Sequence, residues 1–301
     1  MNAANARIRL VHLSDIHVTA RPLGWKRADW FNKRLAAWFN LRGLGRGYRF
    51  RHADRVMVAL MEELRRSPPD RILFSGDATA LGFDAEIAHA AKLLGLENGD
   101  RLPGLAVPGN HDYHTLSAAR SGAFERSFAP WQEGERVDDA IYPFAQRAGE
   151  AWLIAVNTSV PNRWFWDARG DTDAGQLERL ARLLDRLEGG PRILVTHYPV
   201  CLAGGSREKR HHGLRNLERL IDIAQRGGVR LWLHGHRHHA YHHPTTALTS
   251  FPVICAGSAT QSGLWSYGDY ALEGTKFTAI RRAFDETMGG FREVESFVLE
   301  L

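Results

Sequence analysis

The sequence predicts an α/β fold, with one domain spanning residues 1–301. Short apolar runs of strand length alternate with segments of helical periodicity from one end of the chain to the other, and this alternation is typical of helices packed over a sheet. A hydrophobic content of 44% allows a sizeable core. Neither an internal repeat nor a low-complexity linker divides the chain, so a single domain is the simplest interpretation.

Seven short apolar runs predict strands. They are residues 8–13, 71–74, 104–107, 151–156, 192–195, 229–233 and 253–256. Alternating apolar and polar residues at 291–297 indicate an antiparallel pair near the end of the chain.

The helices are marked by periodicity and by their end signals. Helical segments are expected at 56–64, 86–94, 177–187 and 213–225. In the third of these, Asp173 and Gln176 form a capping box before a run of leucines at helical spacing, and Gly189-Gly190-Pro191 ends the run. The pattern therefore predicts helices that separate most of the strands from one another.

Composition excludes several classes of protein. The longest apolar stretches, such as 151–156, fall far short of the roughly 20 residues that a membrane-spanning helix needs. The first nine residues are polar and basic, and the apolar run after them contains His12 and Asp15, so no secretory leader is expected. Cys201 and Cys255 lie in no Cys-x-x-Cys pair, which argues against a disulfide framework and a thiolate zinc site. We expect a cytoplasmic protein.

Polar side chains able to bind metals follow five of the predicted strands. The five clusters are Asp15-Ile16-His17, Gly76-Asp77, Gly109-Asn110-His111-Asp112, Thr196-His197 and Gly235-His236-Arg237-His238. In an open α/β sheet, functional groups gather beyond the carboxyl ends of the strands. Each cluster alone has an ordinary explanation as turn chemistry or as a solvated His-rich loop. Those explanations would have to coincide at five strand ends, so we expect the clusters to form one site.

In this order the five clusters resemble the blocks of the calcineurin-like metallophosphoesterase superfamily: Asp-x-His, Gly-Asp, Gly-Asn-His-Asp, a later His, and Gly-His-x-His. The resemblance implies a four-layer α/β/β/α sandwich, in which two mixed sheets pack face to face with helices outside. It also implies a metal-dependent hydrolase that acts on a phosphodiester or pyrophosphate bond.

The resemblance assigns seven residues to two divalent metal ions. One ion takes Asp15, His17, Asp77 and His238, and the other takes Asp77, Asn110, His197 and His236. A bridging Asp77 makes physical sense, because a carboxylate has two oxygens and its charge offsets the repulsion between two cations. Imidazole, carboxylate and amide ligands without thiolate suit Mn, Fe or Zn, and Mn is favoured.

Two catalytic residues follow from the same resemblance. A metal-activated hydroxide would attack the phosphorus directly, while His111 protonates the leaving group and Asp112 orients His111 or stabilises its charge. Direct attack fits the absence of a separate nucleophile motif such as Gly-x-Ser-x-Gly.

A basic, aromatic insert at about residues 21–55 lies between the first two clusters. It contains ten Lys and Arg against two acidic residues, a net charge of +8, whereas the rest of the chain sums to −3. Within residues 25–42, Phe31, Leu35 and Trp38 recur at i, i+4 and i+7. Such a helix either lies on an anionic membrane surface or packs its apolar stripe on the domain with its charges in water.

The insert also resembles that of a bacterial subgroup that includes the chlamydial-type UDP-2,3-diacylglucosamine hydrolase. This second resemblance implies a pyrophosphate-linked lipid substrate and an enzyme held peripherally on the inner face of the membrane. Three alternatives remain. A cyclic-nucleotide phosphodiesterase would carry the same five clusters, a nuclease would use the +8 segment to neutralise nucleic-acid phosphates, and a non-catalytic scaffold would not need to retain all seven ligands and His111.

Overall fold

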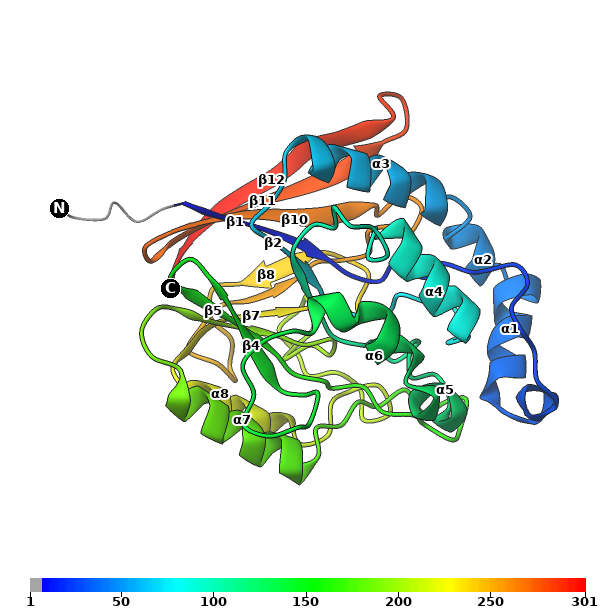
Figure 1. Ribbon diagram of the computed structural model, residues 1–301, viewed down its shortest axis with the longest axis horizontal. Helices are drawn as coiled ribbons and strands as arrows, with labels where there is room; N and C mark the ends of the chain where they lie inside the picture. Colours follow the sequence, from blue (N-terminus) through cyan, green and yellow to red (C-terminus); the bar gives the residue numbers. More distant parts are fainter. Residues whose placement is uncertain (1–6) are drawn as a thin grey trace.

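The computed structural model describes residues 7–301, so the start of the chain, where no leader is expected, lies outside the described residues. Two six-stranded sheets pack face to face, and helices cover the outer face of each (Figure 1). The predicted α/β class and its four-layer arrangement are confirmed.

The first sheet has the strand order β12-β11-β10-β1-β2-β3. Its strands are β1 (Ile8–Leu13), β2 (Arg71–Phe74), β3 (Gly104–Ala106), β10 (Ser266–Glu273), β11 (Lys276–Asp285) and β12 (Gly290–Glu300). Strands β1, β2 and β3 are parallel, whereas β10, β11 and β12 continue the sheet as an antiparallel meander. The antiparallel pair expected near the chain end is therefore part of a longer three-stranded unit.

The second sheet has the order β4-β5-β6-β7-β9-β8. Its strands are β4 (Phe144–Ala148), β5 (Ala151–Ala155), β6 (Arg192–Val195), β7 (Val229–His234), β8 (Tyr241–His243) and β9 (Val253–Cys255). The central four strands are parallel and the two edge strands are antiparallel. All seven predicted strands are present with bounds within two residues, while β4, β8, β10 and β11 were not predicted.

Side chains that alternate along the strands separate the layers. Leu10 of β1 faces the second sheet, whereas the next residue, Val11, faces the helices. The helices are α3 (Ala53–Arg66), α4 (Asp84–Leu93), α5 (Leu116–Ser121), α6 (Ala123–Phe128), α7 (Ala174–Arg186) and α8 (Leu217–Arg226), with a 3₁₀ turn η2 at Ala129–Trp131. Helices α3, α4 and α6 pack on the first sheet, and α7 and α8 pack on the second. Helix α8 starts later than expected because Asn216 has a left-handed backbone.

The insert is broken into three short pieces instead of one helix. They are η1 (Arg27–Phe31), α1 (Lys33–Gly43) and α2 (Arg46–Arg49). The break falls at Asn32, whose side chain accepts a hydrogen bond from the Arg34 amide and caps α1. None of the helices within residues 7–301 is long and apolar enough to cross a bilayer.

The inner face of the insert differs from the predicted stripe. Leu41 and Trp38 pack on Leu81 and Phe83 of the body, but Phe31 is 91% exposed. The residue that faces inward at the start of α1 is instead a cation, Arg34. The predicted apolar stripe is therefore wrong at the start of α1. A buried arginine needs specific hydrogen-bond partners, and partners that are distant in sequence leave no periodic signal.

Candidate metal centre

The seven predicted ligands converge at one edge of the sandwich, where the carboxyl ends of parallel strands from both sheets meet. Each lies in the loop that follows a strand: Asp15 and His17 after β1, Asp77 after β2, Asn110 after β3, His197 after β6, and His236 and His238 after β7. Side chains more than 200 positions apart are thus neighbours, as expected for the ends of parallel strands.

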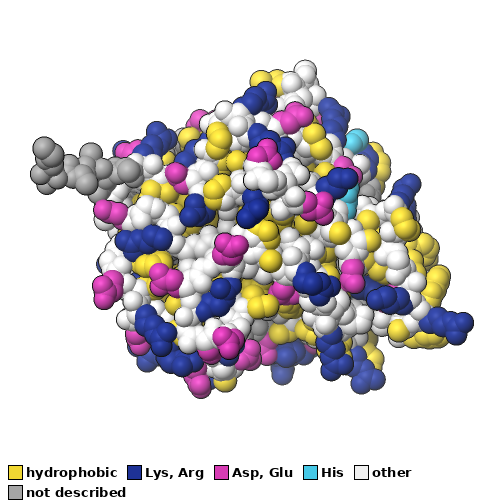
Figure 2. Space-filling model, viewed as in Figure 1, with side chains coloured by type: hydrophobic (Ala, Val, Ile, Leu, Met, Phe, Trp, Pro, Cys, Tyr) yellow, Lys and Arg dark blue, Asp and Glu magenta, His cyan; other side chains and the backbone are white. Residues whose placement is uncertain are grey.

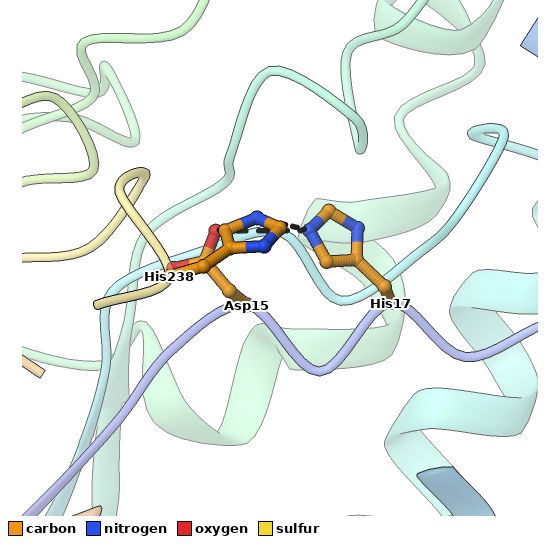
Figure 3. Close-up of side chains that lie close together, drawn as sticks. All are labelled: Asp15, His17 and His238. Carbon is orange, nitrogen blue, oxygen red and sulfur yellow. Dashed lines mark hydrogen bonds and ion pairs between the residues drawn. The ribbon is translucent and has the colours of Figure 1, made fainter. Parts of the chain in front are cut away.

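Three of these side chains, Asp15, His17 and His238, form a compact group between the loops after β1 and β7 (Figure 3). The His17 Nε2 lies 3.1 Å from the His238 Nε2, and an oxygen of Asp15 lies 3.3 Å from that same His238 nitrogen. Two imidazole nitrogens and a carboxylate oxygen therefore face a common point.

A second group lies between the loops after β3, β6 and β7. The side-chain oxygen of Asn110 is 3.1 Å from the His197 Nε2 and 2.9 Å from the His236 Nδ1. One oxygen of Asp77 lies between the two groups, 3.6 Å from the His17 Nε2 and 3.5 Å from the His197 Nε2. Asp77 therefore has the position that a residue shared by two ions requires.

The chemistry of this set fits metal ions. His17 and His197 each use Nδ1 to donate to a backbone carbonyl, of Thr79 at 3.0 Å and of Ser75 at 2.8 Å, so each Nε2 presents a lone pair. Burial lowers the pKa of His17 to about 3 and also lowers that of His197, so both rings are neutral. A buried oxygen of Asp15 has no hydrogen-bond partner among the described residues. Such an orphaned acceptor is costly unless a cation satisfies it.

The backbone at the site is held in an unusual conformation. Among residues 7–301, six residues other than glycine have a positive φ, and five of them are predicted ligands: Asp15, His17, Asp77, His236 and His238. The left-handed region costs an L-residue about 1–2 kcal/mol, and such strain gathers at functional sites. Backbone conformation and the sequence motifs, two independent criteria, therefore point to the same residues.

Two motif glycines are required by close approach. A Cβ on Gly109 would lie 2.1 Å from the Asp77 carboxylate, and a Cβ on Gly76, which has a φ of +98°, would lie 2.6 Å from the Gly109 amide nitrogen. Any larger residue at either position would push the two loops apart. The glycines therefore set the distance between Asp77 and Asn110.

His111 lies beside the ligands but is oriented differently from what the sequence suggests. Its Nδ1 donates to the Ala80 carbonyl at 2.9 Å, and its Nε2 accepts from Arg46 at 2.8 Å. The expected partner, Asp112, makes no hydrogen bond to this ring in the described part of the chain. Its carboxylate instead accepts from three backbone amides, of Ala78, Thr79 and Gly109, and from the Thr79 hydroxyl. Asp112 thus ties two motif loops together, and burial raises its pKa to about 6.

The ligands open into a cavity of about 400 Å³ whose walls were not predicted. One wall is the insert, through Lys33, Ala37 and Arg46, and a second wall is the loop after β5, through Phe165. Burial lowers the pKa of the half-buried Lys33 to about 8. The sequence does contain a signal for the second wall, an unbroken Arg-Trp-Phe-Trp run at 163–166, whereas nothing distinguishes Arg46 from the other arginines of the insert.

Comparisons with known proteins agree with this geometry. The family model for calcineurin-like phosphoesterases matches residues 8–240, well over half of the chain. A relative from Synechococcus sp., named "Probable cyclic nucleotide phosphodiesterase", is 28% identical over 186 residues. The match covers 61% of this chain and 64% of that protein, so the chain spans less than two thirds of the relative's length.

Solved structures share the fold at low sequence identity. A dimetal phosphatase from Danio rerio has a TM-score of 0.66 at 14% identity, over 97% of this chain and 98% of that chain. A purple acid phosphatase from yellow lupin (Lupinus luteus) seeds has a TM-score of 0.62 at 12% identity, over 98% and 54%. The predicted enzyme class, a metal-dependent hydrolase of phosphoric esters, is confirmed at the level of the family. The chain belongs to the calcineurin-like phosphoesterase family.

Proposed function

We propose that this protein is a dinuclear phosphodiesterase or pyrophosphatase whose substrate is amphiphilic. The observation that carries the proposal is the convergence of seven side chains able to bind metals on two adjacent points, with Asp77 between them. When bound, two divalent ions such as Mn would orient the phosphate, neutralise its charge and lower the pKa of an attacking water. Ligands of this kind fit Mn, Fe or Zn equally in their chemistry.

The remaining steps fall to side chains beside the ions. His111 lines the cavity that contains Asp77 and Asn110 and would protonate the leaving oxygen through Nε2, once Nε2 has taken a proton from water in place of its bond to Arg46. Its Nδ1 bond to Ala80 holds the ring plane. Asp112 supports the site by holding the Gly-Asp and Gly-Asn loops at a fixed distance.

An amphiphilic substrate is supported by the surface around the cavity. Hydrophobic and basic side chains alternate over α1 at one end of the molecule (Figure 2). Phe31, Phe39 and Leu44 are exposed on the insert, and Trp164, Phe165 and Trp166 are exposed in the loop after β5. Phe165 also lines the cavity, so a phosphate bound there would have an apolar ring beside the rest of its molecule. UDP-2,3-diacylglucosamine, a pyrophosphate joined to acyl chains, is the substrate that we favour.

The same surface predicts peripheral attachment to an anionic membrane through residues 25–42. Aromatic side chains settle at the headgroup level, and each nearby Lys or Arg adds about 1 kcal/mol. The double variant Phe31→Ser, Phe39→Ser should co-sediment less with anionic vesicles than the wild type. Met288→Ser, which removes an equally exposed apolar side chain from the β11–β12 hairpin, is the matched control. A wild-type protein that stays in the supernatant at low salt would refute the attachment.

A second candidate, a cyclic-nucleotide phosphodiesterase, is favoured by the named activity of the Synechococcus relative. Nuclease activity has less support, because the exposed cations of the insert are interleaved with large apolar side chains. A scaffold role has the least, since it would not require an orphaned carboxylate oxygen at the meeting point of the ligands.

A substrate panel separates the candidates. Metal-loaded protein should hydrolyse bis-p-nitrophenyl phosphate, and it should cleave UDP-2,3-diacylglucosamine faster than cyclic AMP or single-stranded DNA. Faster turnover of cyclic AMP would replace the lipid assignment with the second candidate. No hydrolysis of any panel member, by protein that has two bound ions, would contradict the proposed reaction.

A further inference from the structure

We propose that Arg46 of the insert is a substrate-binding residue, whose guanidinium binds a non-bridging oxygen of the phosphate on the side away from the metal ligands. This inference rests on the proposed function. Arg46 is the first residue of α2, and its Nη2 reaches the His111 Nε2 at 2.8 Å. It lines the same cavity as Asp77, Asn110 and His236. An insert that contains none of the predicted ligands therefore contributes a cation to the reaction site.

The position of Arg46 is fixed by the packing of α2. A Cβ on Gly47 would lie 2.7 Å from the Leu41 carbonyl oxygen, so the short helix folds tightly back on α1. The Arg49 carbonyl accepts from the Ser262 amide at 2.7 Å, which joins α2 to the body. Phe50 is buried, and its ring lies 4.7 Å from that of His17. The backbone that carries Arg46 is thus anchored on both sides.

Arg46 differs from the buried Arg34 and from Arg237, which also lines the cavity, in having no carboxylate partner among the described residues. Arg34 is buried and uses its donors on Asp29 and on the carbonyls of Leu81 and Gly82. Arg237 pairs with Glu208 at 3.0 Å. Within residues 7–301, the guanidinium of Arg46 makes one hydrogen bond, to His111, and no ion pair. Arg46 lines the cavity, so its remaining N–H groups can donate to an anion bound there.

Charge also favours an anion at this point. The acidic side chains whose fields act on Arg46 are Asp77 and Asp15, both predicted metal ligands. Two divalent ions would more than neutralise these carboxylates, so the half-buried guanidinium would face a positively charged centre. A phosphate between the ions and Arg46 removes that repulsion. The planar fork of an arginine matches two oxygens of a phosphate better than any other cationic side chain.

The bond to His111 gives this contact a role in the reaction. Because a guanidinium only donates, the His111 Nε2 must be the acceptor, and the ring proton lies on Nδ1. A phosphate oxygen is a stronger acceptor than a neutral imidazole. A bound phosphate therefore attracts Arg46 away from His111 and leaves the Nε2 lone pair without its donor. Arg46 couples binding of the phosphate to exposure of the catalytic nitrogen.

Inorganic phosphate is the probe that tests this contact without turnover. Titration calorimetry of the metal-loaded protein should show phosphate binding that weakens about tenfold or more in Arg46→Met, the loss expected for one charge-assisted hydrogen bond. Arg46→Lys should keep part of the affinity because it retains charge without the fork. Arg49→Met is the matched control, since it removes a neighbouring exposed cation and should bind phosphate within about twofold of the wild type.

The outcomes separate this inference from the proposed function. Phosphate affinity in Arg46→Met equal to that of the wild type, with both ions bound, overturns the contact even if turnover falls. Weakened phosphate binding by a protein that cleaves no diester would support the contact and reject the proposed reaction. The kcat/KM for bis-p-nitrophenyl phosphate should be lower in Arg46→Met than in the wild type. It should recover in part when guanidinium ion is added to the variant.

Discussion

Single residues at the metal centre combine two properties that rarely occur together. At His17 the imidazole is buried and neutral, and the backbone lies in the left-handed region. Each property is costly to a folded protein, and both are explained if the side chains bind cations. The motif pattern predicts these seven residues as ligands because ligand chemistry restricts the residue type at each position. It does not point to Arg46 or Lys33, because a cation that lines the cavity has no fixed spacing from the ligands.

His111 provides the first prediction at this scale. His111→Ala should lower turnover of bis-p-nitrophenyl phosphate by roughly 10² or more, since the leaving oxygen loses its proton donor. Metal content, measured by elemental analysis, should not change, because Nδ1 of His111 is bonded to the Ala80 carbonyl and Nε2 to Arg46. Turnover equal to that of the wild type would remove His111 from the mechanism.

At the scale of elements, the strands were predictable and the insert was not. A buried strand needs only a short apolar run, and all seven such runs form strands. In the insert, the inward position is taken by Arg34, whose partners Leu81 and Gly82 lie 47 and 48 positions away. The edge strands β4 and β8 were missed because their residues are mixed in polarity and gain their partners only from the neighbouring strand.

The Arg34 contacts predict a large effect on stability. Arg34→Met should lower the free energy of unfolding by about 3–5 kcal/mol, because it leaves the buried Asp29 carboxylate without its cation. Arg42→Met, an exposed arginine of the same helix, should change it by less than about 0.5 kcal/mol. Urea denaturation followed by tryptophan fluorescence measures both. Equal losses in the two variants would mean that the Arg34–Asp29 pair does not anchor the insert.

Glu86 at the start of α4 predicts a pH dependence. Burial raises its pKa from 4.5 to about 7, so ionisation is less favourable in the folded chain than in the unfolded chain. The stability that the neutral carboxyl provides is full below pH 4.5 and is lost as pH rises through about 7. The loss is on the order of 3 kcal/mol. The difference in unfolding free energy between the wild type and Glu86→Gln should follow this curve, and a difference that does not vary with pH would be evidence against it.

Across the whole molecule, the site exists because two sheets direct their parallel strands to the same edge. The first sheet supplies Asp15, His17, Asp77 and Asn110, and the second supplies His197, His236 and His238. Periodicity predicted strands and helices but could not divide the strands between two sheets, because pairing partners are set by tertiary contacts. The division followed only from resemblance to a family. Ion binding should therefore be linked to the docking of one sheet on the other.

That linkage can be measured by thermal unfolding. Mn²⁺ at about 100 times its dissociation constant should stabilise the folded chain by roughly 2.7 kcal/mol for each site, which corresponds to a rise in Tm of about 5 °C or more. Chelation with EDTA should reverse the rise. Asp77→Asn should show a smaller rise, because a carboxamide has no charge to share between two cations. A Tm that does not respond to Mn²⁺ would mean that the two groups of ligands do not bind it.

The left-handed backbone at five ligand positions costs conformational free energy when the chain folds, before any ion binds. At about 1–2 kcal/mol for each residue, the distortion is sustained by hydrophobic burial elsewhere in the sandwich and not by the arriving ions. Glycine at His17 or His238 would relax the chain locally while removing a donor atom. Variants selected only for heat resistance should therefore accumulate substitutions at these positions and lose their capacity for ions as they gain robustness.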